Sequence, residues 1–133
     1  MKSRKYNSNS FRIKKVNKVI WSEQKQRRSG FIFITREPIS DKLLYGLAID
    51  RRHNEYTDFG GGIESKDQNQ LECGLRECRE ETLGFFVLTP YDVSNSIAFL
   101  TNNMVFILHP IDWSVIQKFS LEFPKLVDSH PYT

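Results

Sequence analysis

A short segment of this chain gathers the residue types best suited to catalysis: Glu77, Glu80 and Glu81, with Arg76 directly before them. Residues three and four apart are neighbours on an α-helix, so the three carboxylates would lie on one side of it. Mg²⁺ and Mn²⁺ prefer oxygen ligands of this kind. A bound metal would neutralise phosphate groups and activate a water molecule, so the segment indicates phosphate-ester or pyrophosphate chemistry.

The residues around these glutamates predict the helix itself, beginning near Gln68. At about 100° per residue, an apolar stripe would form from residues that fall within about 60° of one another: Leu71, Leu75, Cys78 and Thr82. Arg76 lies four residues before Glu80 and could pair with it. Three like charges destabilise a helix, so either a divalent metal compensates them or they form a solvated acidic face.

Glycines stand before, inside and after the expected helix. Gly60, Gly61 and Gly62 form a turn that would permit positive φ angles and close approach of the backbone, and N–H groups at the helix start favour anions. Gly84 suits the left-handed position that ends a helix. Gly74 costs about 1 kcal/mol relative to alanine within a helix, and it would let the helix pack closely on a strand.

Residues 61–85 resemble the Nudix box, whose pattern is G-x5-E-x7-R-E-U-x-E-E-x-G-U, where U is aliphatic. Residues 76–81 match the R-E-U-x-E-E core, with Cys78 in the aliphatic position. The residues that precede the core can be aligned with the family pattern in two ways. With Gly62 as the first glycine, Gln68 stands where the family has its first glutamate.

The second alignment begins at Gly61, puts Asp67 at the acidic position and adds one residue before the core. Residues 63–64 then resemble the end of the common GG-x-x-E opening of the family. Two residues, where the family has one, separate the last glutamate of the core from Gly84. These departures lie outside the R-E-U-x-E-E core and concern the outermost acid and the helix end.

The resemblance implies a hydrolase that cleaves a nucleoside diphosphate linked to another moiety, with Mg²⁺ or Mn²⁺ as cofactor and a nucleotide-type small molecule as substrate. It assigns the metal to Glu77, Glu80 and Glu81. Arg76 would orient a glutamate, and Glu80 or Glu81 would serve as the base, a choice that the sequence leaves open. The residues implied near the phosphates, at the edge of the metal site, are Gly61, Gly62, Glu64 and Asp67.

The resemblance also implies an α/β/α sandwich with a mixed β-sheet, and the apolar segments agree with a mixed sheet that has a helix inserted after the glycines. The expected strands are residues 16–21, 31–35, 42–49, 85–89, 96–101 and 104–109. A turn at residues 36–41 predicts one hairpin. Asn102 and Asn103 predict a second, because asparagine favours tight turns.

The C-terminal part is shorter than is usual in the family. Residues 113–119 predict a short helix with Asp112 as its N-cap. Pro124 and Pro131 interrupt regular structure in residues 120–133, so the usual C-terminal strand and helix are expected to be missing. An uncovered sheet face would expose apolar surface and favour a homodimer.

Size and composition predict one domain, because 133 residues with 39% hydrophobic content can bury a core. The chain contains no run of about 18 apolar residues, so no membrane span is predicted. Cys73 and Cys78 match neither a zinc motif nor a disulfide framework, and reduced thiols suit a cytoplasmic, intracellular protein. His53, His109 and His130 show no metal spacing.

Charge is unevenly distributed along the chain. Residues 1–30 carry a net charge of +9 and the remainder −6, which together give +3. A basic segment beside an acidic body suits a polyanionic substrate, of which RNA is one. The alternative is a solubilising tail, since the Ser and Asn content of residues 7–10 favours disorder. The sequence therefore predicts a basic, flexible segment 1–15 and a single Nudix-like domain 16–133.

Several aromatic residues on the expected strands could stack on a nucleobase or belong to the core: Phe31, Phe33, Tyr45, Tyr56, Phe59, Phe99 and Phe106. Three hypotheses remain open: a hydrolase of small nucleotides, a decapping-type hydrolase that holds capped RNA with residues 1–30, and a Nudix-fold binding module without catalysis. The intact Glu77, Glu80 and Glu81 favour the two enzymes.

Overall fold

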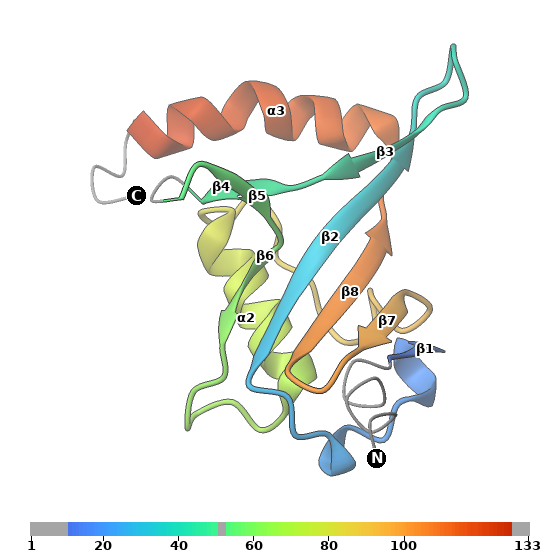
Figure 1. Ribbon diagram of the computed structural model, residues 1–133. Helices are drawn as coiled ribbons and strands as arrows, with labels where there is room; N and C mark the ends of the chain where they lie inside the picture. Colours follow the sequence, from blue (N-terminus) through green and yellow to red (C-terminus); the bar gives the residue numbers. More distant parts are fainter. Residues whose placement is uncertain (1–10, 51–52, 129–133) are drawn as a thin grey trace.

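The computed structural model describes residues 11–50 and 53–128, and in them one mixed β-sheet packs with two α-helices (Figure 1). This confirms the mixed α and β class. The sheet runs, in spatial order, β1 (Arg12–Lys15), β7 (Ile97–Leu100), β8 (Met104–Pro110), β2 (Arg28–Arg36) and β3 (Leu43–Gly46), with β6 (Phe59–Gly62) also paired to β2. Strands β8 and β2 are parallel, and the other pairs are antiparallel. A separate ribbon joins β4 (Ala48–Asp50) and β5 (Glu55–Thr57).

Strand β2 organises the sheet because it pairs with three other strands. One edge pairs with β8, while the other pairs first with β6 and then with β3. Side chains of a strand alternate between the two faces. Phe31 and Phe33 are fully buried on one face, whereas Ile32 and Ile34 on the other are only partly buried. The same alternation in β7 and β8 extends the buried face with Ala98, Leu100, Val105 and Ile107.

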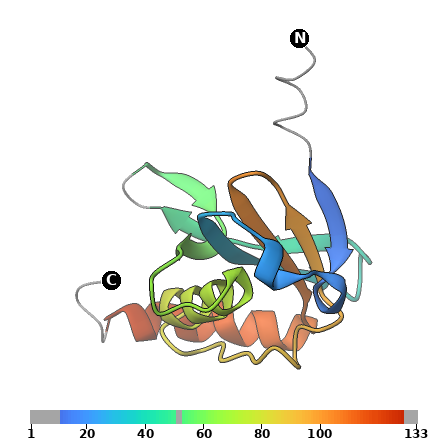
Figure 2. The same cartoon turned by 90° about the horizontal axis from the view of Figure 1, so that it is seen from below.

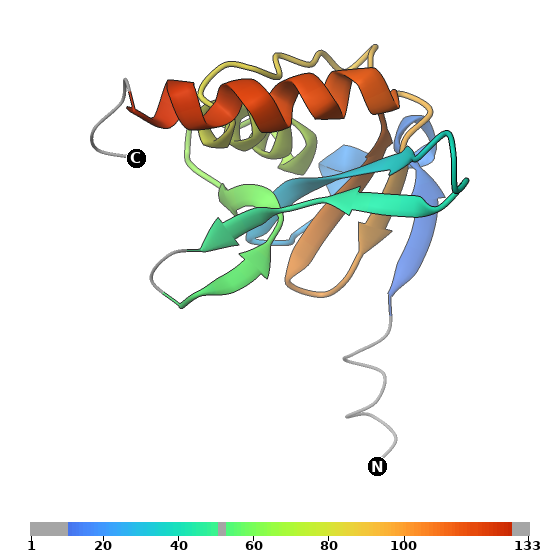
Figure 3. The ribbon, with the colours of Figure 1, turned by 90° about the horizontal axis from the view of Figure 1, so that it is seen from above.

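Both α-helices lie on this buried face (Figures 2 and 3). In α2 (Gln70–Glu81), a Cβ added to Gly74 would lie 2.7 Å from Ser29 Oγ, so the glycine permits the close helix-strand contact that the sequence predicted. In α3 (Trp113–Asp128), the Phe119 ring lies 5.9 Å from that of Phe59. The arrangement of the described residues has two layers and differs from the expected α/β/α sandwich, because both helices lie on the same face of the sheet (Figures 2 and 3).

The C-terminal helix that the prolines were expected to prevent is present. Helix α3 extends to Asp128 and contains Pro124. Phe119 is buried, and its ring centroid lies 4.9 Å from that of Phe123, one turn later. Aromatic packing of this kind favours the helix and acts against the cost of about 3 kcal/mol for a proline inside it. Pro131 lies outside the described residues.

The prediction of a strand at residues 16–21 is wrong. This stretch contains 3-10 turns, η1 (Val16–Lys18) and the start of η2 (Trp21–Glu23). Val16 and Val19 are both buried, and a spacing of three fits a 3-10 turn, whereas a strand would bury every second residue. The strand lies just before this stretch, in β1. Residues 12–15 of the predicted flexible segment 1–15 therefore form an edge strand of the sheet, paired with β7. Residues 1–10 lie outside the described part.

Residues 85–89 also form no strand. Phe85 and Phe86 instead contact Phe119 of α3, with ring centroids 5.0 and 5.2 Å away. Both predicted hairpins are confirmed, since β2 pairs with β3 and β7 with β8 in antiparallel register. Within the described residues, no helix is both long and apolar enough to cross a membrane.

Candidate active site

Helix α2 presents the carboxylates and has the predicted amphipathic character. It begins at Gln70, where the Asn69 side chain accepts a hydrogen bond of 2.9 Å from the Glu72 N–H and so caps the helix. The predicted apolar stripe faces the core, with Leu71, Cys78 and Thr82 buried and Leu75 partly buried. Gly84 has φ of +80°, which is the left-handed conformation predicted after the helix.

Arg76 lies at the centre of an acidic cluster, and its side chain is only 8% exposed. Its Nε and Nη2 donate to the two oxygens of Asp67 at 2.9 and 2.8 Å. Its Nη1 donates to Glu77 Oε2 and Glu80 Oε1, both at 3.1 Å. The predicted pairing of Arg76 with Glu80 is confirmed. The bidentate contact with Asp67 fixes the plane of the guanidinium and thereby the direction of its bonds to the two glutamates.

The residues implied at the edge of the site also contact Arg76. Nη2 of Arg76 donates to the Gly62 carbonyl at 3.2 Å, and Glu64 Oε2 lies 3.5 Å from Nη1. The Glu64 side chain is 53% exposed, but that of Asp67 is only 4% exposed. Hydrogen bonds from Arg76 lower the pKa of Asp67, whose two oxygens both accept from that arginine, and Oδ2 also accepts from the Glu64 N–H. Gln68 is exposed, and its N–H donates to Glu72 Oε1.

The three glycines form strand β6 and not the predicted turn. Among the glycines that the structure describes, Gly84 alone has a positive φ, so conformational freedom does not explain this run. The run is explained by side chains that lie close to the glycine backbone. A Cβ on Gly61 would collide with the carboxylate of Glu77, and one on Gly60 would lie 2.6 Å from Asp58 Oδ2. The bare strand therefore lets two carboxylates lie directly against the backbone.

Burial and mutual repulsion disfavour the ionised forms of two carboxyls on the acidic side of α2. The pKa of Glu77 is raised by desolvation, although Arg76 opposes this. The pKa of Glu81 is raised by desolvation and then by the charge of Glu77, with Arg28 acting in the opposite direction. Glu80 is the most accessible of the bonded acids on this helix, with its side chain 48% exposed. An additional cation near Glu77 and Glu81 would relieve this repulsion.

A second ion pair that sequence reasoning missed lies across β6. Arg28 Nη1 donates to Asp58 Oδ2 at 2.7 Å, and the Asp58 side chain is 1% exposed. Burial opposes the charge of Arg28, but the bond to Asp58 and the charges of Glu77 and Glu81 outweigh it, so its pKa is raised. Gly30, opposite Gly60 in the sheet, leaves the room for this carboxylate. The signal for this ion pair in the sequence was Asp58, an acidic residue two positions before the glycine run.

The metal site implied by the resemblance is not preformed. Within residues 11–50 and 53–128, no three Asp, Glu, His or Cys side chains are grouped as ligands of one metal ion. Arg76 already bonds one oxygen each of Glu77 and Glu80. The donor chemistry nevertheless fits a hard divalent cation, because the helix offers carboxylate oxygens on Glu77, Glu80 and Glu81.

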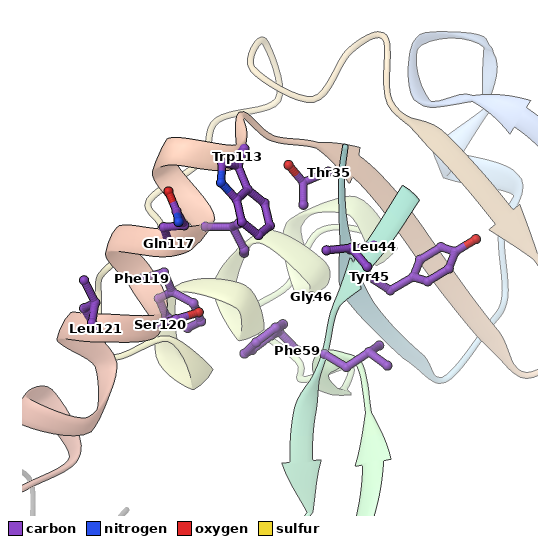
Figure 4. A pocket seen from close by; sticks show the side chains of 12 residues that line it. Thr35, Leu44, Tyr45, Gly46, Phe59, Trp113, Gln117, Phe119, Ser120 and Leu121 are labelled. Atoms are coloured by element: carbon purple, nitrogen blue, oxygen red, sulfur yellow. The ribbon is translucent and has the colours of Figure 1, made fainter. Parts of the chain in front are cut away.

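An apolar pocket of about 570 Å³ lies between α3 and the sheet (Figure 4). Phe59 lines it and directly precedes the three glycines, so the pocket reaches the same strand that Glu77 contacts. Other lining residues come from β3 and α3: Leu44, Gly46, Trp113, Gln117 and Phe119. A volume of this size is typical of small-molecule sites. No protein-family profile, curated protein or solved structure matches the chain.

Proposed function

We propose that this protein is a divalent-metal-dependent pyrophosphohydrolase of the Nudix type, which cleaves a nucleoside diphosphate linked to another moiety. The observation that carries the proposal is the set of Glu77, Glu80 and Glu81 on one helix, with Glu77 lying against the bare glycine strand. Desolvation raises the pKa values of two of these carboxyls, on Glu77 and Glu81, and a bound cation would favour their ionised forms.

Each residue of the cluster then has a physical task. Glu77, Glu80 and Glu81 would hold Mg²⁺ or Mn²⁺, which when bound neutralises pyrophosphate charge and activates a water molecule. Arg76 orients Glu77 and Glu80 through its two bonds from Nη1. Asp67 is assigned to holding Arg76, in place of the phosphate contact expected from the sequence, because both its oxygens accept bonds from that arginine.

The pocket beside Phe59 would take the part of the substrate that is not phosphate. Its lining is mainly apolar and aromatic, with Trp113 and Phe59 on opposite sides and Gln117 among its polar groups (Figure 4). An aromatic lining suits the flat surface of a nucleobase, and a few polar groups fix its orientation. The strand that follows Phe59 leads from this pocket to the Glu77 carboxylate.

The test is turnover of a substrate panel by the full chain with Mg²⁺ or Mn²⁺. The panel contains nucleoside triphosphates, ADP-ribose, dinucleoside polyphosphates and capped RNA. The Glu80→Gln variant is expected to lose turnover, because one metal ligand is neutralised. Glu122→Gln is the matched control: Glu122 is 46% exposed against 48% for Glu80, and it also pairs with a cation four residues away.

Metal-dependent turnover that Glu80→Gln loses and Glu122→Gln keeps would support the hydrolase, and the preferred substrate would distinguish small nucleotides from RNA. Full activity in Glu80→Gln would overturn the assignment of the carboxylate cluster. No turnover on the whole panel, by a protein whose circular dichroism shows it folded, would overturn the hydrolase in favour of a binding module.

A further inference from the structure

The hydroxyl group of Thr35 is buried and has no hydrogen-bond partner among the described residues. Thr35 is 6% exposed, so more than nine-tenths of the residue is removed from solvent. Within the part of the chain that the structure describes, other buried side-chain atoms without a partner belong to Gln26, Ser29 and Gln70, and none of these residues lines the pocket. An unpartnered hydroxyl in a protein interior is unfavourable, so native proteins keep few of them.

The position of Thr35 explains what its hydroxyl could meet. Thr35 lies near the end of β2, two residues after Phe33, and strand alternation puts both side chains on the face that carries the helices. Its register partner in β3 is Leu44, and both residues line the pocket of about 570 Å³ under α3. Figure 4 shows the Thr35 side chain pointing from the strand toward Trp113. The hydroxyl is therefore available to a ligand in the pocket.

We propose that the pocket binds the heteroaromatic base of a nucleotide and that Thr35 determines this specificity, through a hydrogen bond from its hydroxyl to a nitrogen or oxygen atom of the base. The inference deepens the proposed function and rests on it for the phosphate end of the ligand. A hydroxyl group both donates and accepts, so Thr35 can pair with a ring nitrogen, a carbonyl or an amino group.

The remaining lining residues suit a flat and neutral ring. Trp113 and Phe59 supply aromatic surfaces from opposite sides, and each can stack on a base (Figure 4). None of the described residues that line the pocket is acidic or basic, so a phosphate group placed there would lack a compensating charge. The phosphates of the same ligand would lie outside the pocket, along the glycine strand that leads from Phe59 to Glu77.

A hydrocarbon chain fits this pocket less well than a base does. An acyl chain has no polar atom to offer along its length, so the Thr35 hydroxyl would remain unpaired and out of contact with water in the complex. A base supplies the missing partner together with a similar apolar contact area. The unpartnered hydroxyl therefore favours the base between these two classes of ligand.

The experiment is isothermal titration calorimetry of the full chain with adenosine, guanosine, cytidine and uridine in EDTA, and with decanoate as a hydrocarbon probe. Nucleosides carry no phosphate, so the titration tests the pocket without metal and without turnover. The Thr35→Val variant keeps the shape of the side chain and removes the hydroxyl. It is expected to weaken binding of the preferred nucleoside roughly 3- to 10-fold, as for the loss of one neutral hydrogen bond.

Thr82→Val is the matched control for a buried threonine. Thr82 is fully buried, but its hydroxyl donates to the Cys78 carbonyl at 2.7 Å and accepts from the Phe86 N–H at 3.2 Å. This variant should lower the urea midpoint of unfolding and leave nucleoside binding unchanged. Thr35→Val should leave the midpoint of the free protein at least as high as in the parent chain, because its hydroxyl has no bond to lose there.

A second pair of variants tests the aromatic contact. Trp113→Leu is expected to weaken nucleoside binding roughly 5- to 100-fold, the range for the loss of one stacked base. Trp21→Leu is its control, because Trp21 lies in η2, donates its indole N–H to the Val16 carbonyl at 3.2 Å and does not line the pocket. Circular dichroism confirms that each variant is folded before it is compared.

Nucleoside binding that Thr35→Val and Trp113→Leu weaken and both controls retain would support the proposal. No nucleoside binding by the folded chain, unchanged affinity in Thr35→Val, or binding of decanoate in place of the nucleosides would overturn it. Binding and turnover fail separately. Nucleoside binding of this kind without turnover of any substrate would uphold the base pocket and remove the hydrolase, whereas turnover with the same KM in Thr35→Val would uphold the hydrolase and remove the role of Thr35.

Discussion

Replacement of Arg76 by methionine is expected to destabilise the protein by about 3–5 kcal/mol at pH 7. The variant keeps an unbranched apolar stem but removes the guanidinium that Asp67, Glu77 and Glu80 share. The Asp67 side chain is 4% exposed and that of Glu77 is 12% exposed, so neither carboxylate can regain its hydration without local opening. Removing one partner of a buried ion pair typically costs this much, because an uncompensated charge remains.

The measurement is urea unfolding in EDTA, followed by circular dichroism. Arg36→Met is the matched control, because the Arg36–Asp41 pair has a distance of 3.7 Å and side chains that are 57% and 78% exposed. Exposed pairs contribute little, so this variant should remain within about 0.5 kcal/mol of the parent chain. If Arg76→Met also stayed within 0.5 kcal/mol, Arg76 would not be the group that compensates the cluster, and the orientation of Glu77 and Glu80 would need another cause.

Two further predictions concern titrating groups. Because Arg76 lowers the pKa of Asp67 from 3.8, ionised Asp67 contributes stability that is complete above pH 3.8 and is lost as pH falls through its lower folded-state pKa. The difference in unfolding free energy between the parent chain and Asp67→Asn should therefore shrink below about pH 3.8, and a constant difference down to pH 2 would contradict this cause. Burial raises the pKa of Cys73 to about 11 and that of Cys78 to about 12. Neither thiol should react with a disulfide reagent at pH 8 until urea unfolds the chain, and rapid labelling of the native protein would refute this.

The sequence determined the features that depend on local spacing. The 3.6-residue period gave helix α2 with its apolar stripe, and the four-residue step from Arg76 gave the pair with Glu80. The turn residues Asn102 and Asn103 specified the β7–β8 hairpin. These features were readable because the groups that make them lie within a few residues of one another, where backbone geometry alone fixes their distance.

The tertiary structure decided everything that depends on contacts between distant segments. Asp67 binds Arg76 from outside the helix, Arg28 reaches Asp58 thirty residues away, and Glu77 is buried because strand β6 lies beneath it. Helix α3 continues past a proline, and aromatic residues from three segments meet at Phe119 within it. Which face of the sheet receives both helices, and which is left open, depends on these long-range contacts, and no local pattern in the chain encodes them.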